Sequence, residues 1–186
     1  MNLVLDASAP VPCGEKPEEE KEAIARLGII LYEEALDITI YLSTGIIKLY
    51  RSKAFPLLKK HHPMPPFQAR LYMLRDEFEK IITRSRGVIC KPLQKEGLKF
   101  HVLGRSYLER YNVDNLGLRS EDDKEVLRVA LAAANKEVTL VTTDHHFLNN
   151  LDWNRLREIY PERTQRIKIA RPSELISYLK EEKTTI

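Results

Sequence analysis

The chain has 186 residues, of which 43% are hydrophobic and 31% charged, which argues against a disordered chain and against a membrane protein. No apolar stretch approaches the roughly 18 residues of a membrane span, and no signal peptide opens the sequence. Two cysteines, Cys13 and Cys90, are too few for a disulfide scaffold, and the seven glycines form no P-loop or dinucleotide-binding motif. We therefore expect residues 1–186 to form one domain of a cytoplasmic protein without a membrane partner.

The first half of the chain alternates short apolar strands with helical segments. Asn2–Asp6 is predicted to be a buried strand, and a helix is predicted over Glu15–Ala35, where apolar residues recur three and four apart. Ile38–Leu42 is rich in β-branched residues and is predicted to be the second strand. The remaining predictions are a helix from Ser43 or Thr44 to Arg51, a proline-rich loop over Pro56–Pro66, a helix over Phe67–Arg84 and an extended segment or strand at Val88–Cys90. The basic, proline-rich stretch around 51–67 is treated as an insertion into the domain.

The second half continues the alternation. Its strongest signals are a helix over Ser120–Ala134 and a buried strand over Val138–Thr142. The other predictions are a helix over Phe100–Tyr111, a loop at Asn112–Gly117, a turn or short helix at His145–Asn150, a helix at Trp153–Tyr160, a strand at Arg166–Ala170 and a closing helix that begins at Pro172. Strands that alternate with helices predict an α/β fold with a parallel sheet covered on both faces. In such sheets ligands bind at the carboxyl ends of the strands.

Charge is distributed unevenly along the sequence. Residues 1–47 carry a net charge of −6, residues 48–95 a net charge of +9, and residues 96–186 none. The basic region is suited to a polyanion such as nucleic acid, but it could equally be a set of solvated helix faces that balance the acidic N-terminal third. Aromatic residues within it could stack on bases, although we expect Tyr72 to be in the core. The candidate nucleic-acid-binding residues are Lys48, Arg51, Lys53, Lys59, Lys60 and Arg70.

Aspartates stand where the predicted sheet would place a functional site. Asp6 directly follows the first strand, Asp144 follows the strand at Val138–Thr142, and Asp122 and Asp123 open the helix before that strand. If the two strands are neighbours, these carboxylates converge and repel one another, and Mg²⁺ or Mn²⁺ would offset that repulsion. Such a cation lowers the pKa of a bound water and steadies the charge of a phosphate under attack.

Each aspartate also has a purely structural interpretation. Asp6 could cap a turn, and Asp144 could cap the short segment that follows it. Ser120 with Asp123 three residues later matches a capping-box pattern, which needs no function at all. The sequence alone leaves both interpretations open, and the functional one draws its weight from the three positions together.

Three segments, taken in order, resemble the PIN-domain family of nucleases. The first is Leu3-Val4-Leu5-Asp6-Ala7-Ser8, which resembles the opening of PIN domains. The second is the helix that begins Asp123-Lys124-Glu125-Val126-Leu127 and continues to Ala130. The third is Thr142-Thr143-Asp144-His145-His146-Phe147, similar to the Thr-x-Asp-x-x-Phe ending of the family.

The resemblance implies a three-layer α/β/α sandwich and a divalent-metal-dependent endoribonuclease. It implies that Asp6, Asp123 and Asp144 are catalytic residues that hold Mg²⁺ or Mn²⁺, with Ser8, Thr142 and Asp122 in support. RNA, possibly single-stranded, is the expected partner. VapC-type toxins belong to this family, so the resemblance also suggests a homodimer, an antitoxin-like protein partner and a toxin–antitoxin role, although the chain is longer than a compact toxin.

One departure from the family pattern concerns its second acidic residue, usually a Glu on the helix after the second strand. In this sequence Lys48 stands about where that Glu would be. A lysine there would oppose a metal, so the alternative is a catalytically weak or inactive PIN-like module that binds nucleic acid. Two further alternatives fit poorly. A haloacid-dehalogenase-like phosphatase would need Asp where Ser8 stands, and the acidic pair and late lysine of a receiver domain are not evident.

Overall fold

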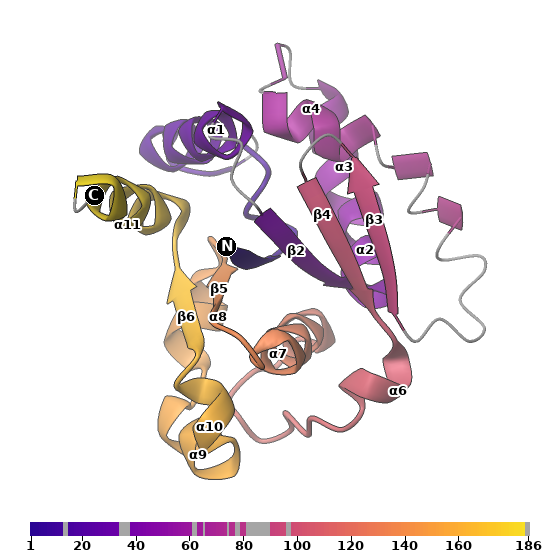
Figure 1. Ribbon diagram of the computed structural model, residues 1–186, viewed down its shortest axis with the longest axis vertical. Coiled ribbons are helices and arrows are strands. Elements are labelled where there is room, and N and C mark those ends of the chain that lie inside the picture. Colours follow the sequence, from indigo (N-terminus) through magenta and orange to yellow (C-terminus); the bar gives the residue numbers. More distant parts are fainter. Residues whose placement is uncertain are drawn as a thin grey trace.

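A computed structural model of the protein (Figure 1) describes residues 1–12, 15–33, 38–60, 63–64, 66–73, 75–76, 79–80, 90–95 and 98–184. Its centre is a six-stranded sheet in the order β3-β4-β2-β1-β5-β6. The strands are β1 (Asn2–Leu5), β2 (Ile38–Ser43), β3 (Cys90–Lys95), β4 (Leu98–Leu103), β5 (Val138–Val141) and β6 (Ile167–Ala170). Five of them run parallel, and β3 joins the edge as an antiparallel partner of β4.

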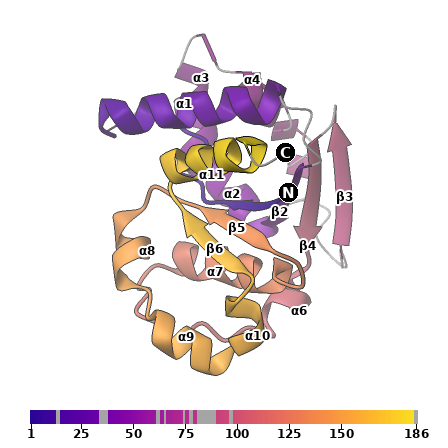
Figure 2. The ribbon, with the colours of Figure 1, turned by 60° about the vertical axis from the view of Figure 1, so that its left-hand side comes forward.

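Helices cover both faces of this sheet, which makes the predicted α/β/α sandwich. On one face α1 (Glu18–Glu33) lies beside α11 (Pro172–Thr184), and on the other face α7 (Glu121–Ala133) packs across β1, β2 and β5 (Figures 1 and 2). The other helices are α2 (Thr44–Leu49), the π-helical turn η1 (Tyr50–Ala54), α3 (Phe55–Lys60), α4 (Pro66–Met73), α6 (Arg105–Leu108), α8 (His145–Asn150), α9 (Trp153–Ile159) and α10 (Pro161–Thr164).

The central strands are apolar because helices cover them on both sides. Leu3, Val4 and Leu5 of β1 are at most 2% exposed, and so are Val138 and Leu140 of β5. A strand buried on both faces is a continuous apolar run rather than an alternating one, as the sequence of β1 predicted. None of the helices in the described part of the chain is long and apolar enough to cross a membrane.

Two predicted elements were wrong. The predicted helix over Phe100–Tyr111 is instead the end of β4 followed by the single turn α6. Leu98–Leu103 pairs along its full length with β2, and this tertiary pairing outweighs the local helical pattern. The predicted loop over Pro56–Pro66 begins as the helix α3, which continues an unbroken helical run over residues 44–60, and Pro56 lies within that run directly after η1.

Other boundaries differ by less. The strand predicted at Val88–Cys90 is β3, which begins at Cys90 and continues to Lys95. Of the extended segment or strand predicted at Val88–Cys90, only Cys90 is among the described residues. Of the helix predicted over Phe67–Arg84, the structure describes α4 and the helical residues 75–76 and 79–80, and the rest lies outside the described residues. The short segment predicted at His145–Asn150 is the helix α8.

Candidate active site

The sheet reverses its strand order between β1 and β5. From β1 the chain adds β2 and then β4 on one side, and it then returns to place β5 on the other side of β1. Leu5 pairs with Val141 at the end of this ladder, so the residues that follow them, Asp6 and Thr142, emerge next to each other. In open parallel sheets such a reversal leaves a crevice at the carboxyl ends of the strands, which is where ligands bind.

Asp6 is held at this crevice by backbone and side-chain hydrogen bonds. Its N–H donates to the carbonyl oxygen of Val141 over 3.0 Å, which extends the ladder by one residue. Its Oδ2 accepts hydrogen bonds from Ser8 Oγ at 2.5 Å and Thr142 Oγ1 at 2.9 Å. Two hydroxyl donors to one oxygen fix the orientation of the carboxylate, which is the supporting role predicted for both side chains.

Asp144 is tied to the same network through its backbone. Its N–H donates to Thr142 Oγ1 over 3.0 Å, and its Oδ1 accepts a hydrogen bond from the backbone N–H of Phe147 over 3.3 Å. The second contact caps the start of α8, so the structural interpretation of Asp144 is correct. Capping leaves the carboxylate at the crevice, where it also lines the cavity described below.

Asp122 and Asp123 reach the crevice from the first turn of α7. Ser120 caps this helix by accepting a hydrogen bond from the N–H of Asp122 over 3.1 Å. Asp122 and Asp123 therefore sit on the first turn, where the helix dipole stabilises negative charge. Ser120 does form a cap, as the capping-box pattern predicted, and Asp123 nevertheless faces the cavity.

The predicted carboxylates line one cavity of about 190 Å³. Its polar wall is formed by Asp6, Asp122, Asp123 and Asp144 together with Lys16 and Lys53. The remaining lining residues are Ala7, Ser8, Val11, Leu49 and Leu57. Three segments that are far apart in the sequence thus contribute acids to one pocket, as the motif spacing predicted.

The electrostatic consequence of this convergence is clearest at Asp123. Burial, followed by the charges of Asp144, Asp6 and Asp122, raises the pKa of Asp123 from 3.8 to about 6, and Lys53 opposes that shift. Burial and the neighbouring carboxylates together therefore disfavour the charged form of Asp123 near neutral pH. Beneath the cavity the buried Tyr50 hydroxyl donates to the carbonyl oxygen of Leu5 over 2.8 Å, and burial with the charge of Asp6 raises the pKa of Tyr50 well above 10.

Of the lysines on the helical run over residues 44–60, Lys53 lines the cavity, whereas Lys48 lies outside it. Lys48 is exposed on α2 and does not line the cavity. Lys53 belongs to η1, and its Nζ lies 2.7 Å from Asp122 Oδ2. Lys53 shares one face of the helical run with two other lining residues, Leu49 four positions before it and Leu57 four positions after it. The helix was predicted to end at Arg51, so this face was not predicted.

The other candidate nucleic-acid-binding residues lie around the same helical run. Arg51 forms an ion pair with Glu79 at 3.0 Å, while Lys59 and Lys60 are exposed on α3. Arg70 lies on α4, and its side chain is outside the described part of the structure. Tyr72 is half-buried against the core. Its ring lies edge-on to that of Phe55, with 5.7 Å between the ring centres, so the expected core role is met in part.

The donor set of the cavity suits a hard divalent cation. All four acids offer carboxylate oxygens, which Mg²⁺ and Mn²⁺ prefer. The pKa of Asp123 is raised first by burial and then by the neighbouring carboxylates, and a bound cation would offset both effects. As they stand, however, no group of three or more His, Cys, Asp or Glu side chains among the described residues is arranged to hold a metal ion. The chemistry of the donors therefore fits, and the ligand cluster is not preformed.

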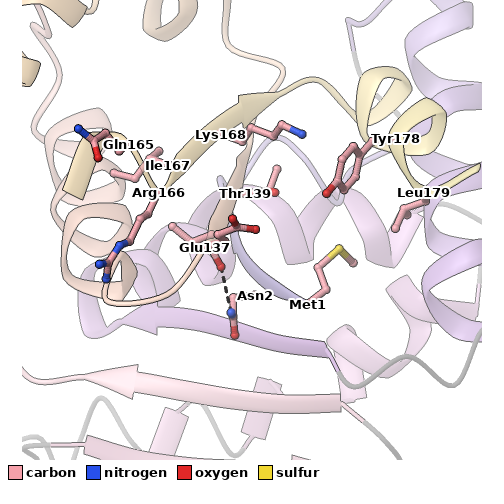
Figure 3. A pocket seen from close by; sticks show the side chains of 11 residues that line it. Met1, Asn2, Glu137, Thr139, Gln165, Arg166, Ile167, Lys168, Tyr178 and Leu179 are labelled. Atoms are coloured by element: carbon pink, nitrogen blue, oxygen red, sulfur yellow. Dashed lines mark hydrogen bonds between the residues drawn. The ribbon is translucent and has the colours of Figure 1, made fainter. Parts of the chain in front are cut away.

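A larger cavity of about 560 Å³ lies at the opposite, amino-terminal end of the strands (Figure 3). Its lining mixes signs of charge, with Glu137 beside Arg166 and Lys168. The Lys168 ammonium lies 3.6 Å from the centre of the Tyr178 ring, and Arg166 donates to the carbonyl oxygen of Asn135. This cavity has no concentration of one chemical group comparable with the aspartates at the other end.

Comparisons with known proteins leave the family open, since no family model, no curated protein and no solved structure matches this chain. The candidate site therefore rests on its own geometry and on the sequence resemblance. The aspartates and the hydroxyl side chains of the site were predicted from the sequence. Lys16, Tyr50 and the placement of Lys53 within the site were not. The repeat of lining residues at 49, 53 and 57 is the signal that could have revealed Lys53.

Proposed function

We propose that this protein is a divalent-metal-dependent endoribonuclease of the PIN type, which hydrolyses phosphodiester bonds of RNA. The observation that carries the proposal is the convergence of Asp6, Asp123 and Asp144 on one cavity at the strand-order reversal. These residues were predicted from three separate motifs, and aspartates that only cap turns would have no reason to share a pocket.

Asp6, Asp123 and Asp144 would hold the cation, with Asp122 beside them. A bound divalent cation supplies an activated water and offsets the charge of the scissile phosphate. Ser8 and Thr142 hold the Asp6 carboxylate through hydrogen bonds to its Oδ2, so this carboxylate loses little conformational entropy when a ligand binds.

The test is RNA cleavage in Mn²⁺ by the wild type, Asp144→Asn and the control Glu137→Gln. Glu137 lies at the other end of the sheet and its side chain is exposed, so we expect it to be silent. We expect Asp144→Asn to lower the cleavage rate by about 100-fold or more, because one charged ligand is lost. Equal cleavage by all three proteins would overturn the catalytic role of Asp144.

A second candidate function is a PIN-like module that binds RNA without cleaving it. It is favoured by the Lys53 ammonium, which already lies beside Asp122 in the cavity where a metal would bind. In that case RNA affinity would fall with salt concentration and would not depend on a divalent cation. Binding measured at several salt concentrations, with EDTA or with Mn²⁺, separates this function from the nuclease.

The remaining partners belong to the proposal as well. RNA would contact the exposed lysines at 48, 59 and 60, which flank the carboxylate cavity along the chain. A homodimer, an antitoxin-like partner and a cytoplasmic location stay predictions from the sequence. Size-exclusion chromatography with light scattering would test the homodimer directly.

A further inference from the structure

The carboxylate cavity contains a positive charge of its own. Lys53 Nζ donates a hydrogen bond to Asp122 Oδ2 over 2.7 Å, and the charges of Asp122, Asp6 and Asp123 all act to raise the pKa of Lys53. The lysine side chain is 61% exposed and that of Asp122 is 44% exposed, so water reaches the pair. Lys53 is therefore paired with a carboxylate, and its exposed side chain can also adopt other orientations in water.

Lys53 lies within the π-helical turn η1. The N–H of Phe55 donates to the carbonyl oxygen of Tyr50, five residues earlier, so one extra residue is accommodated between α2 and α3. Tyr50 is fully buried and anchored to Leu5 at the end of β1, which fixes the turn against the strand that carries Asp6. Turns of this kind occur frequently at functional sites.

The net charge of the cavity lining indicates what Lys53 does there. The described lining residues include four aspartates and two lysines, a formal net charge of −2. One divalent cation would neutralise that charge, and loss of Lys53 would leave −3. An ammonium and a metal ion are attracted by the same carboxylates, and they repel each other when both are present.

We propose that Lys53 is a built-in counter-ion of the carboxylate cavity, which stabilises the metal-free site and competes with a divalent cation for it. The inference rests on the proposed function, because that function gives the cavity a metal to bind. When the cation enters, Lys53 gives up its contact with Asp122 and its ammonium becomes available to the phosphate of a substrate. Lys53 thereby sets how much free metal the site requires.

The experiment is a calorimetric titration of the metal-free protein with Mn²⁺ for the wild type and three variants. Lys53→Met removes the charge and the hydrogen bond, and Lys53→Gln removes the charge but keeps a donor. Lys48→Met is the matched control, since Lys48 is exposed on the same helical run but lies outside the cavity. We expect both Lys53 variants to bind Mn²⁺ about five- to tenfold more tightly than the wild type, a modest gain because water screens the charge.

Thermal unfolding provides a readout that does not depend on activity. Without metal, we expect Lys53→Met to unfold at a lower temperature than the wild type at pH 8, where the carboxylates are charged. Addition of Mn²⁺ should then raise its unfolding temperature by more than it raises that of the wild type. Lys48→Met should follow the wild type in both conditions.

The outcomes separate this inference from the function beneath it. Equal or weaker Mn²⁺ binding by the Lys53 variants would overturn the counter-ion role and leave the nuclease proposal standing. Binding by the Lys53 variants but not by the wild type would support the role and favour the non-cleaving module for the natural chain. No binding by any of the four proteins would overturn both proposals.

Discussion

The two ends of the central sheet offer a direct comparison, because each holds a cavity lined by residues of β1 or its immediate extension. The amino-terminal cavity is about 560 Å³ and the carboxyl-terminal one about 190 Å³. The larger one mixes Glu137 with Arg166 and Lys168 (Figure 3), whereas the smaller one concentrates aspartates. Volume alone would therefore select the end of the sheet with the less distinctive chemistry.

The ends also differ in how they are held. At the carboxyl-terminal end the hydrogen bonds that hold β1 and Asp6, from Tyr50 to Leu5 and from Thr142 to Asp6, are buried or half-buried, whereas the contact between Lys53 and Asp122 is exposed. At the amino-terminal end Asn2 donates to the carbonyl oxygen of Glu137 in an exposed contact. Buried polar contacts constrain geometry more strongly than solvated ones, so the smaller cavity has the more rigid frame.

The largest effect that would sharpen this comparison is expected at Tyr50. Tyr50→Phe removes a buried hydroxyl that anchors η1 to β1, and we expect it to cost about 1–2 kcal/mol of unfolding free energy. Tyr160→Phe is the control, since its hydroxyl makes an exposed bond to the carbonyl oxygen of Asn112 and should cost less than about 0.5 kcal/mol. Denaturant titrations measure both, and equal losses would contradict the contrast between the buried and exposed frames.

An intermediate effect on stability is expected at Asp123, where the substitution should stabilise the protein rather than destabilise it. Its pKa is raised to about 6 in the folded protein, so the ionised carboxylate destabilises the metal-free fold. That penalty is absent below pH 4, grows as the pH rises toward 6 and is complete above it. We expect Asp123→Asn to raise the unfolding temperature by about 2–4 °C at pH 8, a figure discounted for solvent screening, and to change little at pH 4.

Mn²⁺ provides the control for the Asp123 experiment. If the penalty comes from crowded carboxylates, the cation should narrow the difference between the wild type and Asp123→Asn at pH 8. Differential scanning calorimetry at the two pH values, with and without Mn²⁺, gives all the comparisons. A gain in stability at pH 4 as large as that at pH 8 would show that packing, rather than charge, is responsible.

The smallest effect is expected at the other end of the sheet. Lys168→Met removes the ammonium that lies over the Tyr178 ring, and we expect a loss of about 0.5–1 kcal/mol. RNA cleavage in Mn²⁺ should stay at the wild-type rate, because this cavity and the aspartates lie at opposite ends of the strands. A fall in cleavage without a comparable fall in stability would mean that the two cavities are coupled.

Much of the fold could be predicted because its signals are local. The apolar run before Asp6, the capped helix after Ser120 and the strand before Thr142 all lie within a residue or two of their predicted places. The failure at Phe100–Tyr111 came where partners distant in the sequence decide the structure. Leu98–Leu103 is a strand because β2 and β3 lie on either side of it, and no local pattern reports those neighbours.

The candidate site divides in the same way. Asp6 and Asp144 follow predicted strands, so their convergence required only that β1 and β5 be adjacent, as the register of Leu5 with Val141 confirms. Lys53 was predicted to contact nucleic acid as part of a basic, proline-rich insertion around 51–67. Its place beside Asp122 follows from the continuation of the helix through η1 into α3, beyond the predicted end of the helix at Arg51.

The sequence by itself determined the alternation of strands and helices and the residue types at the ends of the strands, since apolar periodicity and capping act over a few residues. Only the tertiary structure decided that Lys53, and not Lys48, meets the aspartates, and that four acids share one cavity with two lysines. The physical reason is that charges interact through space. Their effect on one another depends on distances that are fixed only when the whole chain has packed.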